Sequence, residues 1–470
     1  MRKFLRGLLF TILVVWAVWG SYRILSWKDT TGGYLSSTQQ LSHTGEGLID
    51  VLFLGSSHCY CSVYPDYLWR DSGIAAFDLA ISGQDKWSSY YSLREALKTQ
   101  TPKVVLVESY SLIFEGYGHE GNKYRNLLSH GLSADSIALA EKIDGENLWN
   151  YILRWPIVHT RYRELTQYDF VQYKPSVYGR GSEHDWTIGY GPDLERQISC
   201  TDTAELSEDN KEWLDSMLAL SRENDFDLIF FVAPMQLYGD NQQIINAASE
   251  YVREQGSVFV DFAKLSHELY FDPAKDFTDS NHCNAYGAAK VTGYWRDYLQ
   301  EHYQLVDHRG SKDYELWDLS YLYHCRLEAE MEYNTSTDSL EAYLYKAMHD
   351  EYLTMIISIG SGISGEEYSA RLSQCMEQLG IYILDYPQGG KWVWQNGECI
   401  FSMDGADTQV YFLDLSRTDT LRIENRSAKY GEAGTEDVKI NRTPYGGGTD
   451  GIAVLLYDNF RGTVIGSWQQ

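Results

Sequence analysis

The segment Ile49-Asp50-Val51-Leu52-Phe53-Leu54-Gly55-Ser56-Ser57-His58 joins an apolar run to a turn of small residues, and the architecture of the first domain follows from it. A short continuous apolar run is typical of a strand that is covered on both faces of a sheet. The glycine and serines after it let backbone N–H groups approach a substrate carbonyl. We therefore expect Ser57 at the carboxyl end of a parallel strand, where α/β sheets bind their ligands.

Further apolar runs of the same kind alternate with helical patterns along the chain. The runs lie at Ala75–Ala80, Lys103–Glu108, Asp227–Ala233 and Val258–Asp261. The helical patterns lie at Trp87–Lys98, Glu212–Arg222 and Ile244–Glu254. Ser207 is placed to cap the second of these helices. The alternation predicts an α/β domain over residues 49–305, with a parallel sheet between two layers of helices.

A second motif, Asp279-Ser280-Asn281-His282, supplies the groups that a reactive serine needs. His282 is the expected general base, and Asp279 would fix its tautomer and stabilise the imidazolium. Ser57 is the predicted nucleophile, because its own N–H can point into an oxyanion hole beside it. Gly83, at the tip of the Ala75–Ala80 strand, offers a second unshielded N–H. The alternatives are an ordinary turn for the first motif and a helix cap followed by a surface histidine for the second.

The N-terminus, residues 1–27, predicts a membrane anchor. Met1–Arg6 is basic and Gly7–Tyr22 carries no charge. With its apolar flanks, this run approaches the ~20 residues that a helix needs to cross a bilayer core. Basic residues before the span predict a single-pass protein with a cytoplasmic N-terminus and the bulk of the chain outside the cell membrane. A cleaved signal peptide is the alternative, although Ala17–Tyr22 offers poor cleavage sites.

Two further segments organise the first half of the chain. Residues 28–48 are polar and rich in Ser, Thr, Gly and Gln, so we expect a stalk between the anchor and the α/β domain. Residues 111–202 are too long for a structureless loop and predict a helical insertion that covers the active edge of the sheet. Its aromatic side chains, Trp149 and Trp155 among them, either stack on sugar rings or pack a small core of the insertion.

The last part of the chain, residues 306–470, has a different character. Short apolar runs alternate with glycine and aspartate turns, for example at Trp392–Trp394, Val410–Leu413 and Ile452–Tyr457. This spacing predicts an α+β domain whose strands are mostly antiparallel.

Charge and cysteine content exclude several functional classes. The net charge of −27 has the wrong sign for a protein that binds the phosphate backbone, so nucleic acid is not an expected partner. The seven cysteines form no C-x-x-C pair, and no cluster of His and Cys has zinc spacing. We therefore expect no metal and no cofactor. Cys59, Cys61 and Cys283 flank the two motifs and are expected to be packed thiols, with a disulfide as the alternative.

Taken in order, the motifs resemble the SGNH (GDSL-like) hydrolase superfamily. The matching blocks are Gly55-Ser56-Ser57, Gly83, and Asp279-Ser280-Asn281-His282 continued by Asn284–Gly287. The third block of that superfamily should offer an asparagine after the next strand, but Val107-Glu108-Ser109-Tyr110 contains none. The resemblance covers Ile49–Tyr303 and implies the three-layer fold of the superfamily, with Ser57, His282 and Asp279 as its triad and Ser57 and Gly83 as oxyanion donors.

The missing asparagine is a departure that membrane-anchored relatives share, including the D-alanyl transfer protein of teichoic acid modification and alginate-type O-acetyltransferases. The resemblance therefore implies an extracytoplasmic O-acyltransferase, with acetyl as the expected group, or an acyl esterase. Its substrate would be a cell-envelope polysaccharide or a teichoic acid-like polymer, and a polytopic membrane acyltransferase is an implied partner. The alternative is a catalytically inactive protein of the same fold that binds glycans or assembles the envelope.

The C-terminal domain carries a second resemblance. Gly451–Asn459 with Gly462–Ile465, and Leu372–Gly380 before Trp392–Trp394, are similar in permuted order to the stem domain of a sugar-binding glycosyltransferase and to interleukin-like secreted factors. The resemblance implies that residues 306–470 bind carbohydrate.

Overall fold

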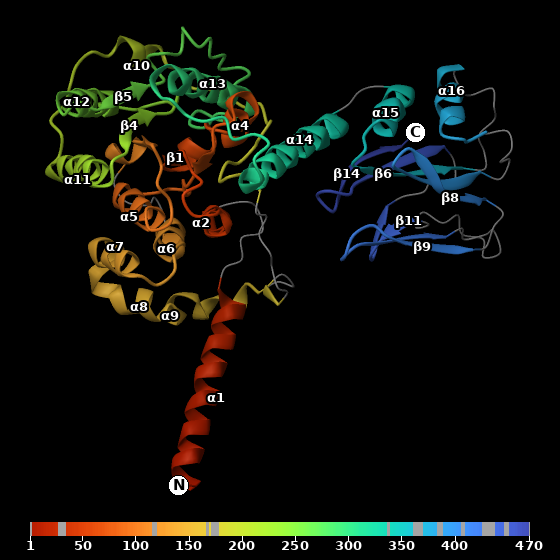
Figure 1. The fold of residues 1–470 in the computed structure, drawn as a ribbon, viewed down its shortest axis with the longest axis horizontal. Helices are drawn as coiled ribbons and strands as arrows, with labels where there is room; N and C mark the ends of the chain where they lie inside the picture. The colour runs from red at the N-terminus through yellow and green to blue at the C-terminus, as the bar shows by residue number, and fades with distance from the viewer. Residues whose placement is uncertain are drawn as a thin grey trace. The chain divides into compact units, whose positions relative to one another are not determined.

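The computed structural model describes residues 2–26, 34–114, 120–165, 169–170, 178–335, 339–360, 370–382, 389–405, 409–424, 438–445 and 451–469. The chain forms two compact units, Met1–Leu322 and Tyr323–Gln470, and each is described by itself (Figure 1). The division falls within α14 (Glu315–Thr335), because Trp317 at its start is fully buried in the core of the first unit. The boundary expected at residue 305 lies shortly before this helix.

The first unit is built on a parallel sheet with the strand order β2-β1-β3-β4-β5. Its strands are β1 (Val51–Leu54), β2 (Ala76–Asp78), β3 (Val104–Glu108), β4 (Asp227–Val232) and β5 (Val258–Asp261). Each neighbouring pair is parallel. The predicted mixed α/β architecture with a parallel sheet is therefore present. All five carboxyl ends lie at one edge, so the loops after the strands meet there.

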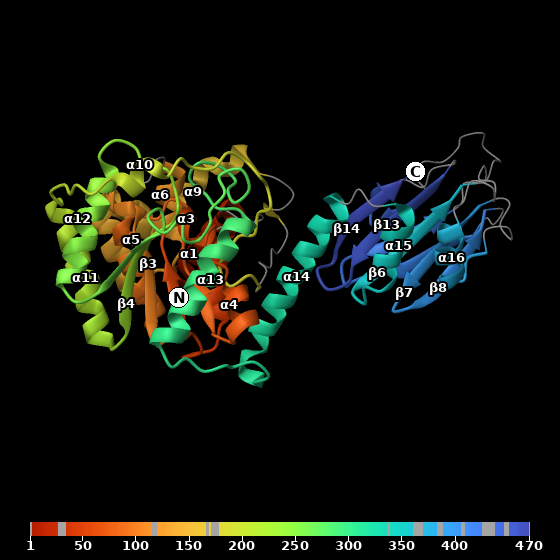
Figure 2. The ribbon, with the colours of Figure 1, turned by 90° about the horizontal axis from the view of Figure 1, so that it is seen from above.

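Helices cover both faces of this sheet. They include α4 (Pro65–Ser72), α5 (Lys86–Ala96), α11 (Glu208–Asn224), α12 (Asn241–Glu254) and α13 (Ala285–His302). Successive residues of β1 point to opposite faces: Leu52 and Leu54 pack with α5, α11 and α12, whereas Val51 and Phe53 pack with α4 and α13. Figure 2 shows α11 and α12 on one side of the strands and α4 and α13 on the other.

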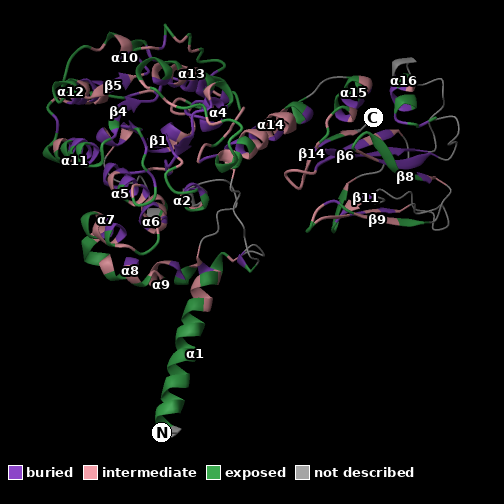
Figure 3. Ribbon diagram, in the orientation of Figure 1, coloured by how far each residue is buried: buried purple, intermediate pink, exposed green. Residues whose placement is uncertain are grey.

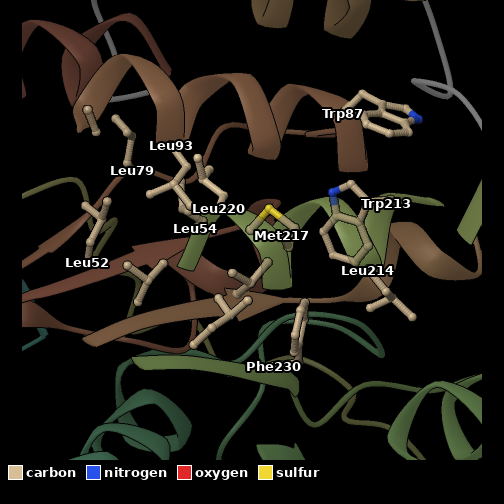
Figure 4. Packing of buried hydrophobic residues seen from close by; sticks show 14 of the residues in the cluster. Leu52, Leu54, Leu79, Trp87, Leu93, Trp213, Leu214, Met217, Leu220 and Phe230 are labelled. Atoms are coloured by element: carbon tan, nitrogen blue, oxygen red, sulfur yellow. The ribbon is translucent and has the colours of Figure 1, made fainter. Parts of the chain in front are cut away.

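The packing on the α5 and α11 face is dense and aromatic (Figure 4). Trp213, Leu214 and Met217 of α11 are fully buried against Leu54 of β1 and Phe230 of β4. These α11 residues have helical spacing, which is why one side of the helix can lie flat on the sheet. Burial of such side chains contributes roughly 1.5–3 kcal/mol each and fixes the strands whose ends carry the candidate site.

The helix boundary predicted at Ser207 is confirmed. The Ser207 side chain accepts a hydrogen bond from the Asn210 N–H at 3.2 Å, and α11 begins at the next residue. The helix ends at Asp225, which adopts the left-handed conformation with φ of 59°. A local cap at each end therefore sets the length of this helix.

The N-terminal helix α1 (Arg2–Leu25) is the one described helix that is long and apolar enough to span a membrane. An 18-residue window within Lys3–Leu25 has a mean hydropathy of 1.8, and little of that window is buried. Figure 3 shows α1 exposed along most of its length. An N-terminal signal sequence can also be an apolar helix of this kind.

The segment expected to be a stalk is partly helical. Within residues 28–48, α2 (Tyr34–His43) packs on the first unit, where Gln40 and Leu41 are buried. Residues 28–33 lie outside the described residues. The apolar side chain of Leu41 explains the difference, because a polar composition hides a single residue that reaches the core.

The insertion contains several helices among the residues that the structure describes, whereas its described residues 178–194 form no helix. It contains α6 (Glu120–Leu128), α7 (Ala134–Asp144), α8 (Leu148–Leu153), α9 (Trp155–Val158) and α10 (Glu195–Ser199), with the short 3-10 helices η1 (Tyr110–Leu112), η2 (Gly145–Asn147) and η3 (His159–Arg163). Tyr151 and Leu139 join the core cluster of the first unit. Part of the aromatic content therefore packs the insertion against the sheet domain.

The second unit contains two antiparallel sheets, as the sequence predicts. The larger has the order β14-β13-β6-β7-β8 and the smaller β12-β11-β10-β9. Their bounds are β6 (Leu353–Ile359), β7 (Gly390–Gln395), β8 (Glu398–Asp404), β9 (Val410–Asp414), β10 (Thr420–Glu424), β11 (Val438–Ile440), β12 (Thr443–Tyr445), β13 (Ile452–Asp458) and β14 (Thr463–Gln469). One core cluster lies between the sheets, and a second lies between the larger sheet and helices α15 (Leu340–Met348) and α16 (Ala370–Gln378).

Candidate active site

The turn after β1 fixes the position of Ser57. Gly55 has φ of 149°, and a Cβ at this position would come within 2.5 Å of Glu108 Cβ on β3. Only glycine lets the two strands remain this close where the chain turns. The short helix α3 (Ser57–Tyr60) begins at once, with Ser56 as its N-cap. The Ser57 side chain consequently lies at the carboxyl end of β1 and remains partly exposed.

The loop after β2 lies alongside this turn. Ile81 N–H donates to the Gly55 carbonyl at 3.0 Å, and the Gln84 side-chain carbonyl accepts from Gly55 N–H at 3.1 Å. Gly83 stands between these two residues and is left-handed, with φ of 60°. The structure thus places Gly83 in the loop that is hydrogen-bonded to the serine turn.

The motif with Asp279 and His282 lies in the loop before α13, more than 200 residues after Ser57 in the sequence. Asn284 caps α13 and is fully buried; its Oδ1 accepts from Tyr286 and Gly287 N–H, and its Nδ2 donates to the carbonyls of Thr187 and Lys275. These bonds tie the motif both to the helix and to the loop around residue 187. The position of His282 is therefore held by backbone on two sides.

The three predicted triad residues come together in one hydrogen-bonded chain. Ser57 Oγ lies 2.8 Å from His282 Nε2. His282 Nδ1 lies 3.0 and 3.1 Å from the two carboxylate oxygens of Asp279. The His282 and Asp279 side chains are 28% and 53% exposed, so a substrate can reach the chain of residues from solvent. The spacing matches that of a nucleophile, a base and an orienting carboxylate.

The charge of Asp279 suits the orienting position. Partial burial opposes its ionisation, but hydrogen bonds from Asn281 N–H and from His282 outweigh burial and lower its pKa. Asp279 is therefore ionised at neutral pH. An ionised carboxylate on Nδ1 holds the proton on that nitrogen and leaves Nε2 free to accept a proton from Ser57.

His58 is a neighbour whose importance the sequence did not indicate. Its ring stacks on His282, with centroids 4.9 Å apart and planes 5° from parallel. Burial, helped by the nearby His282, lowers the pKa of His58 to about 3. A neutral ring at this position supports the His282 ring without repelling the imidazolium form.

Glu108 is the last residue of β3. The asparagine of the superfamily pattern is expected shortly after this strand and is absent from Glu108-Ser109-Tyr110. Glu108 is buried, and its carboxylate accepts hydrogen bonds from Ser56 Oγ at 3.1 Å and from Tyr110 N–H at 2.9 Å. Burial raises the pKa of Glu108 to about 7. Since Ser56 Oγ also lies 2.8 Å from His58 Nδ1, this carboxyl anchors the turn beneath Ser57.

Asn122 on α6 is a second residue that the sequence did not single out. A Cβ on Gly83 would lie 2.6 Å from the Asn122 side-chain nitrogen, so the amide packs directly on Gly83. The next turn of the helix adds Asn126, whose Nδ2 lies 3.3 Å from the Ser82 carbonyl. No motif surrounds Asn122, and only the fold brings α6 to the Gly83 loop.

The cysteines near the site are unpaired. Cys59 and Cys283 are buried, Cys61 is partly buried, and none of the seven cysteines forms a disulfide. Burial raises the pKa of all three thiols near the motifs, so they remain protonated. They act as packing residues rather than as metal ligands or nucleophiles.

Comparisons with known proteins give little to set beside this geometry. No protein-family model and no curated protein matches the chain. Among solved structures, the chain is similar to a Bacteroides fragilis protein proposed to be an acylhydrolase, at 11% sequence identity and a TM-score of 0.30. The similarity covers 58% of this chain and 99% of that one.

Proposed function

We propose that the chain is a serine enzyme that handles acyl esters, and that its catalytic residues are Ser57, His282 and Asp279. The observation that carries this proposal is the continuous hydrogen-bonded chain from Ser57 Oγ through the His282 ring to the Asp279 carboxylate. This chemistry needs only proton transfer and nucleophilic attack, so no metal or cofactor takes part in it.

The reaction proceeds in two balanced steps. In the first, Ser57 Oγ attacks the ester carbonyl while His282 Nε2 takes the hydroxyl proton, and collapse of the tetrahedral intermediate expels an alkoxide that receives this proton. In the second, water or an acceptor hydroxyl gives its proton to His282 and attacks the acyl-serine. Collapse of this second tetrahedral intermediate leaves the acyl group on the acceptor and returns the proton from His282 to Ser57 Oγ. Asp279 stabilises the imidazolium in both steps.

The tetrahedral oxyanion requires donors that are fixed in advance. Backbone N–H groups of Ser57 and Gly83 are the proposed donors from the two turns. We further propose that the Asn122 amide, packed on Gly83, supplies the side-chain donor in place of the asparagine that is missing after β3. This assignment gives the insertion a direct part in catalysis.

For the substrate, we propose an O-acyl group, with acetyl as the expected group, on a cell-envelope polysaccharide or teichoic acid-like polymer. The apolar helix α1 supports a membrane-anchored protein. The resemblance of the serine and histidine motifs to those of envelope acyltransferases supports transfer over hydrolysis. A polytopic membrane acyltransferase would supply the acyl group. The second unit would hold the polymer through carbohydrate binding.

A second candidate function is a catalytically inactive protein of this fold that binds glycans or assembles the envelope. The observation that favours it is the absence of the expected asparagine after β3. Glu108, at the end of that strand, is buried and its carboxylate bonds to Ser56. Without a third donor, the oxyanion would be stabilised less. The two functions differ in whether Ser57 is reactive.

A fluorophosphonate probe separates the two candidates. The full-length protein, kept in membranes or detergent, is labelled and the modified peptide is identified by mass spectrometry. We expect a label on Ser57 that disappears in Ser57→Ala and in His282→Ala. The matched control is Ser216→Ala, which removes a partly exposed serine on α11 and should label like the parent. A parent protein that is folded by circular dichroism but is not labelled would support the inactive protein.

A further inference from the structure

The short helix α8 presents an apolar face that nothing in the described part of the first unit covers. Trp149 and Leu153 are 71% and 63% exposed. They are four residues apart, so they lie on the same side of the helix. Tyr151, on the other side, is buried and donates a hydrogen bond to Asp144 at 2.6 Å. The helix is thus fixed on its inner side and apolar on its outer side.

The residues that follow α8 contact the C-terminal end of α1. The indole N–H of Trp155 donates to Ser21 Oγ at 3.1 Å, and the Arg161 guanidinium donates to the Leu25 carbonyl at 2.6 Å. Figure 1 shows α9 next to the end of α1, with α8 continuing from α9 to one side. Residues 148–163 and the end of α1 therefore belong to one contiguous surface.

The depth of this surface follows from the composition of α1. The uncharged run from Gly7 ends at Tyr22, and Arg23 packs over the Trp19 ring at 5.0 Å. Tryptophan followed by arginine is typical of the boundary between the hydrocarbon core and the headgroups. A rise of ~1.5 Å per residue puts Ser21 and Leu25 within about 6 Å of each other along the helix axis. Trp155, which contacts Ser21, and Arg161, which contacts Leu25, therefore lie at headgroup depth if α1 spans a bilayer.

The charges of the segment also suit a lipid surface. Residues 148–163 contain Arg154, Arg161 and Arg163 and no acidic residue, in a chain whose net charge is −27. Arg161 is paired with Asp169 at 3.1 Å, whereas Arg163 is exposed. Glu146 and Glu164 flank the segment on its two sides. The segment next to α1 is thus basic and aromatic, with an acidic residue close to each of its ends.

We infer that residues 148–163 form an interfacial membrane-contacting element, in which Trp149 and Leu153 enter the boundary between headgroups and acyl chains beside α1. The exposed Arg163, together with Arg23, contacts lipid phosphates. Burial of apolar area and attraction of arginine to anionic headgroups are the two forces that hold such elements in a membrane. The inference rests on α1 being retained in a bilayer, and it is independent of catalysis by Ser57.

The test uses the full-length protein in vesicles of phosphatidylcholine with a minor fraction of phosphatidylglycerol. The vesicles carry a lipid with a photoactivatable diazirine near the top of the acyl chain, and crosslinked peptides are mapped by mass spectrometry. We expect crosslinks on α1 and on residues 148–163. The double variant Trp149→Glu and Leu153→Glu should lose crosslinks on residues 148–163 several-fold and keep those on α1. Val306→Glu, which changes another exposed apolar residue of the first unit, is the matched control and should leave both unchanged.

Each other outcome overturns the inference. Crosslinks on α1 with none on residues 148–163 would mean that the segment lies in water. Hydrogen exchange of residues 148–163 can also be compared between native membranes and these vesicles. Protection in native membranes alone would mean that a protein partner, and not lipid, covers these residues. A lack of crosslinks on α1 itself would remove the premise that α1 is embedded. Fluorophosphonate labelling of Ser57 in the same samples reports separately on the proposed enzyme.

Discussion

Two adjacent serines have different environments at the end of β1. Ser57 faces His282, whereas the hydroxyl of Ser56 is hydrogen-bonded to Glu108 and lies against His58. The sequence predicts the choice of Ser57 from the open N–H of a turn, and the hydrogen bond to His282 gives a separate reason for the same choice. The sequence can predict this choice because the exposed N–H belongs to the turn that the motif itself forms.

Glu108 predicts a specific dependence of stability on pH. Burial raises its pKa from 4.5 to about 7, so the folded protein binds this proton more tightly than the unfolded chain does. The stabilisation is full below about pH 4.5 and is lost as the pH rises through about 7. Between these values the slope is at most about 1.4 kcal/mol per pH unit.

Urea titrations of Glu108→Gln across this range test the prediction. The variant should lack the contribution, so the free energy of unfolding of the parent relative to the variant should fall as the pH rises. Glu223→Gln, an exposed substitution on α11, is the control and should run parallel to the parent. A parallel profile for Glu108→Gln as well would contradict the assigned burial effect.

The proposed role of Asn122 predicts a fall in kcat when its side chain is removed. If its amide is an oxyanion donor, Asn122→Ala should lower kcat for a small acetyl ester by about 10²-fold, as the loss of one such donor does. KM should change little, because the contact forms mainly in the transition state. Asn224→Ala removes an asparagine at the end of α11 and should keep the parent kcat. Equal rates for Asn122→Ala and the parent would leave the backbone donors alone in the oxyanion hole.

At the scale of elements, the cap of α13 links the fold to the site. Asn284 is fully buried and makes four hydrogen bonds to backbone groups only two residues after His282. Asn284→Ala should lower the stability by about 1–3 kcal/mol. Because the loop before α13 would lose its attachment, the rate of fluorophosphonate labelling of Ser57 should also fall.

A melting curve and a labelling time course measure the two effects of Asn284→Ala. The control is Ser207→Ala, which removes the cap of α11 on a different helix and should cost about 1 kcal/mol without slowing the labelling. If both variants lose stability and both label at the parent rate, the α13 cap does not position the Asp279 and His282 loop.

The elements differ in how far the sequence predicts them. Long apolar runs such as those of β3 and β4, and the cap at Ser207, are local signals, and the structure contains each of them. Residues whose part depends on a distant neighbour are not visible in this way: Leu41 reaches the core from a polar segment, and Asn122 meets Gly83 through the packing of α6. Tertiary contacts, which no local pattern encodes, place these residues.

At the scale of the whole molecule, the apolar helix α1 and the acidic remainder of the chain predict a retained anchor. Mass spectrometry of the mature protein should find the peptide that contains Leu8–Trp19, and the protein should stay in the membrane fraction after extraction with alkaline carbonate. A basic segment followed by an uncharged span inserts with its basic end in the cytoplasm. Proteases added outside the cell membrane should therefore reach both compact units.

The control for the anchor prediction is the chain with Leu13→Arg and Val14→Arg, which interrupts the apolar run and should release the protein from membranes. The competing result is a mature chain that begins within or just after Ala17–Tyr22. That result would identify a signal peptide and would place the protein outside the membrane.

The turn at Ser56 and Ser57 determines what happens when the reactive serine is lost. Two neighbouring hydroxyls suggest redundancy, in which either one replaces the other. The carboxyl of Glu108 beneath Ser56 and the glycine before it remove that freedom, because Ser56 cannot rotate toward His282 without giving up the hydrogen bond that holds the turn. On the proposed assignment, Ser57→Ala should abolish the activity with no bypass by Ser56, and reversion should require the side chain at position 57 itself.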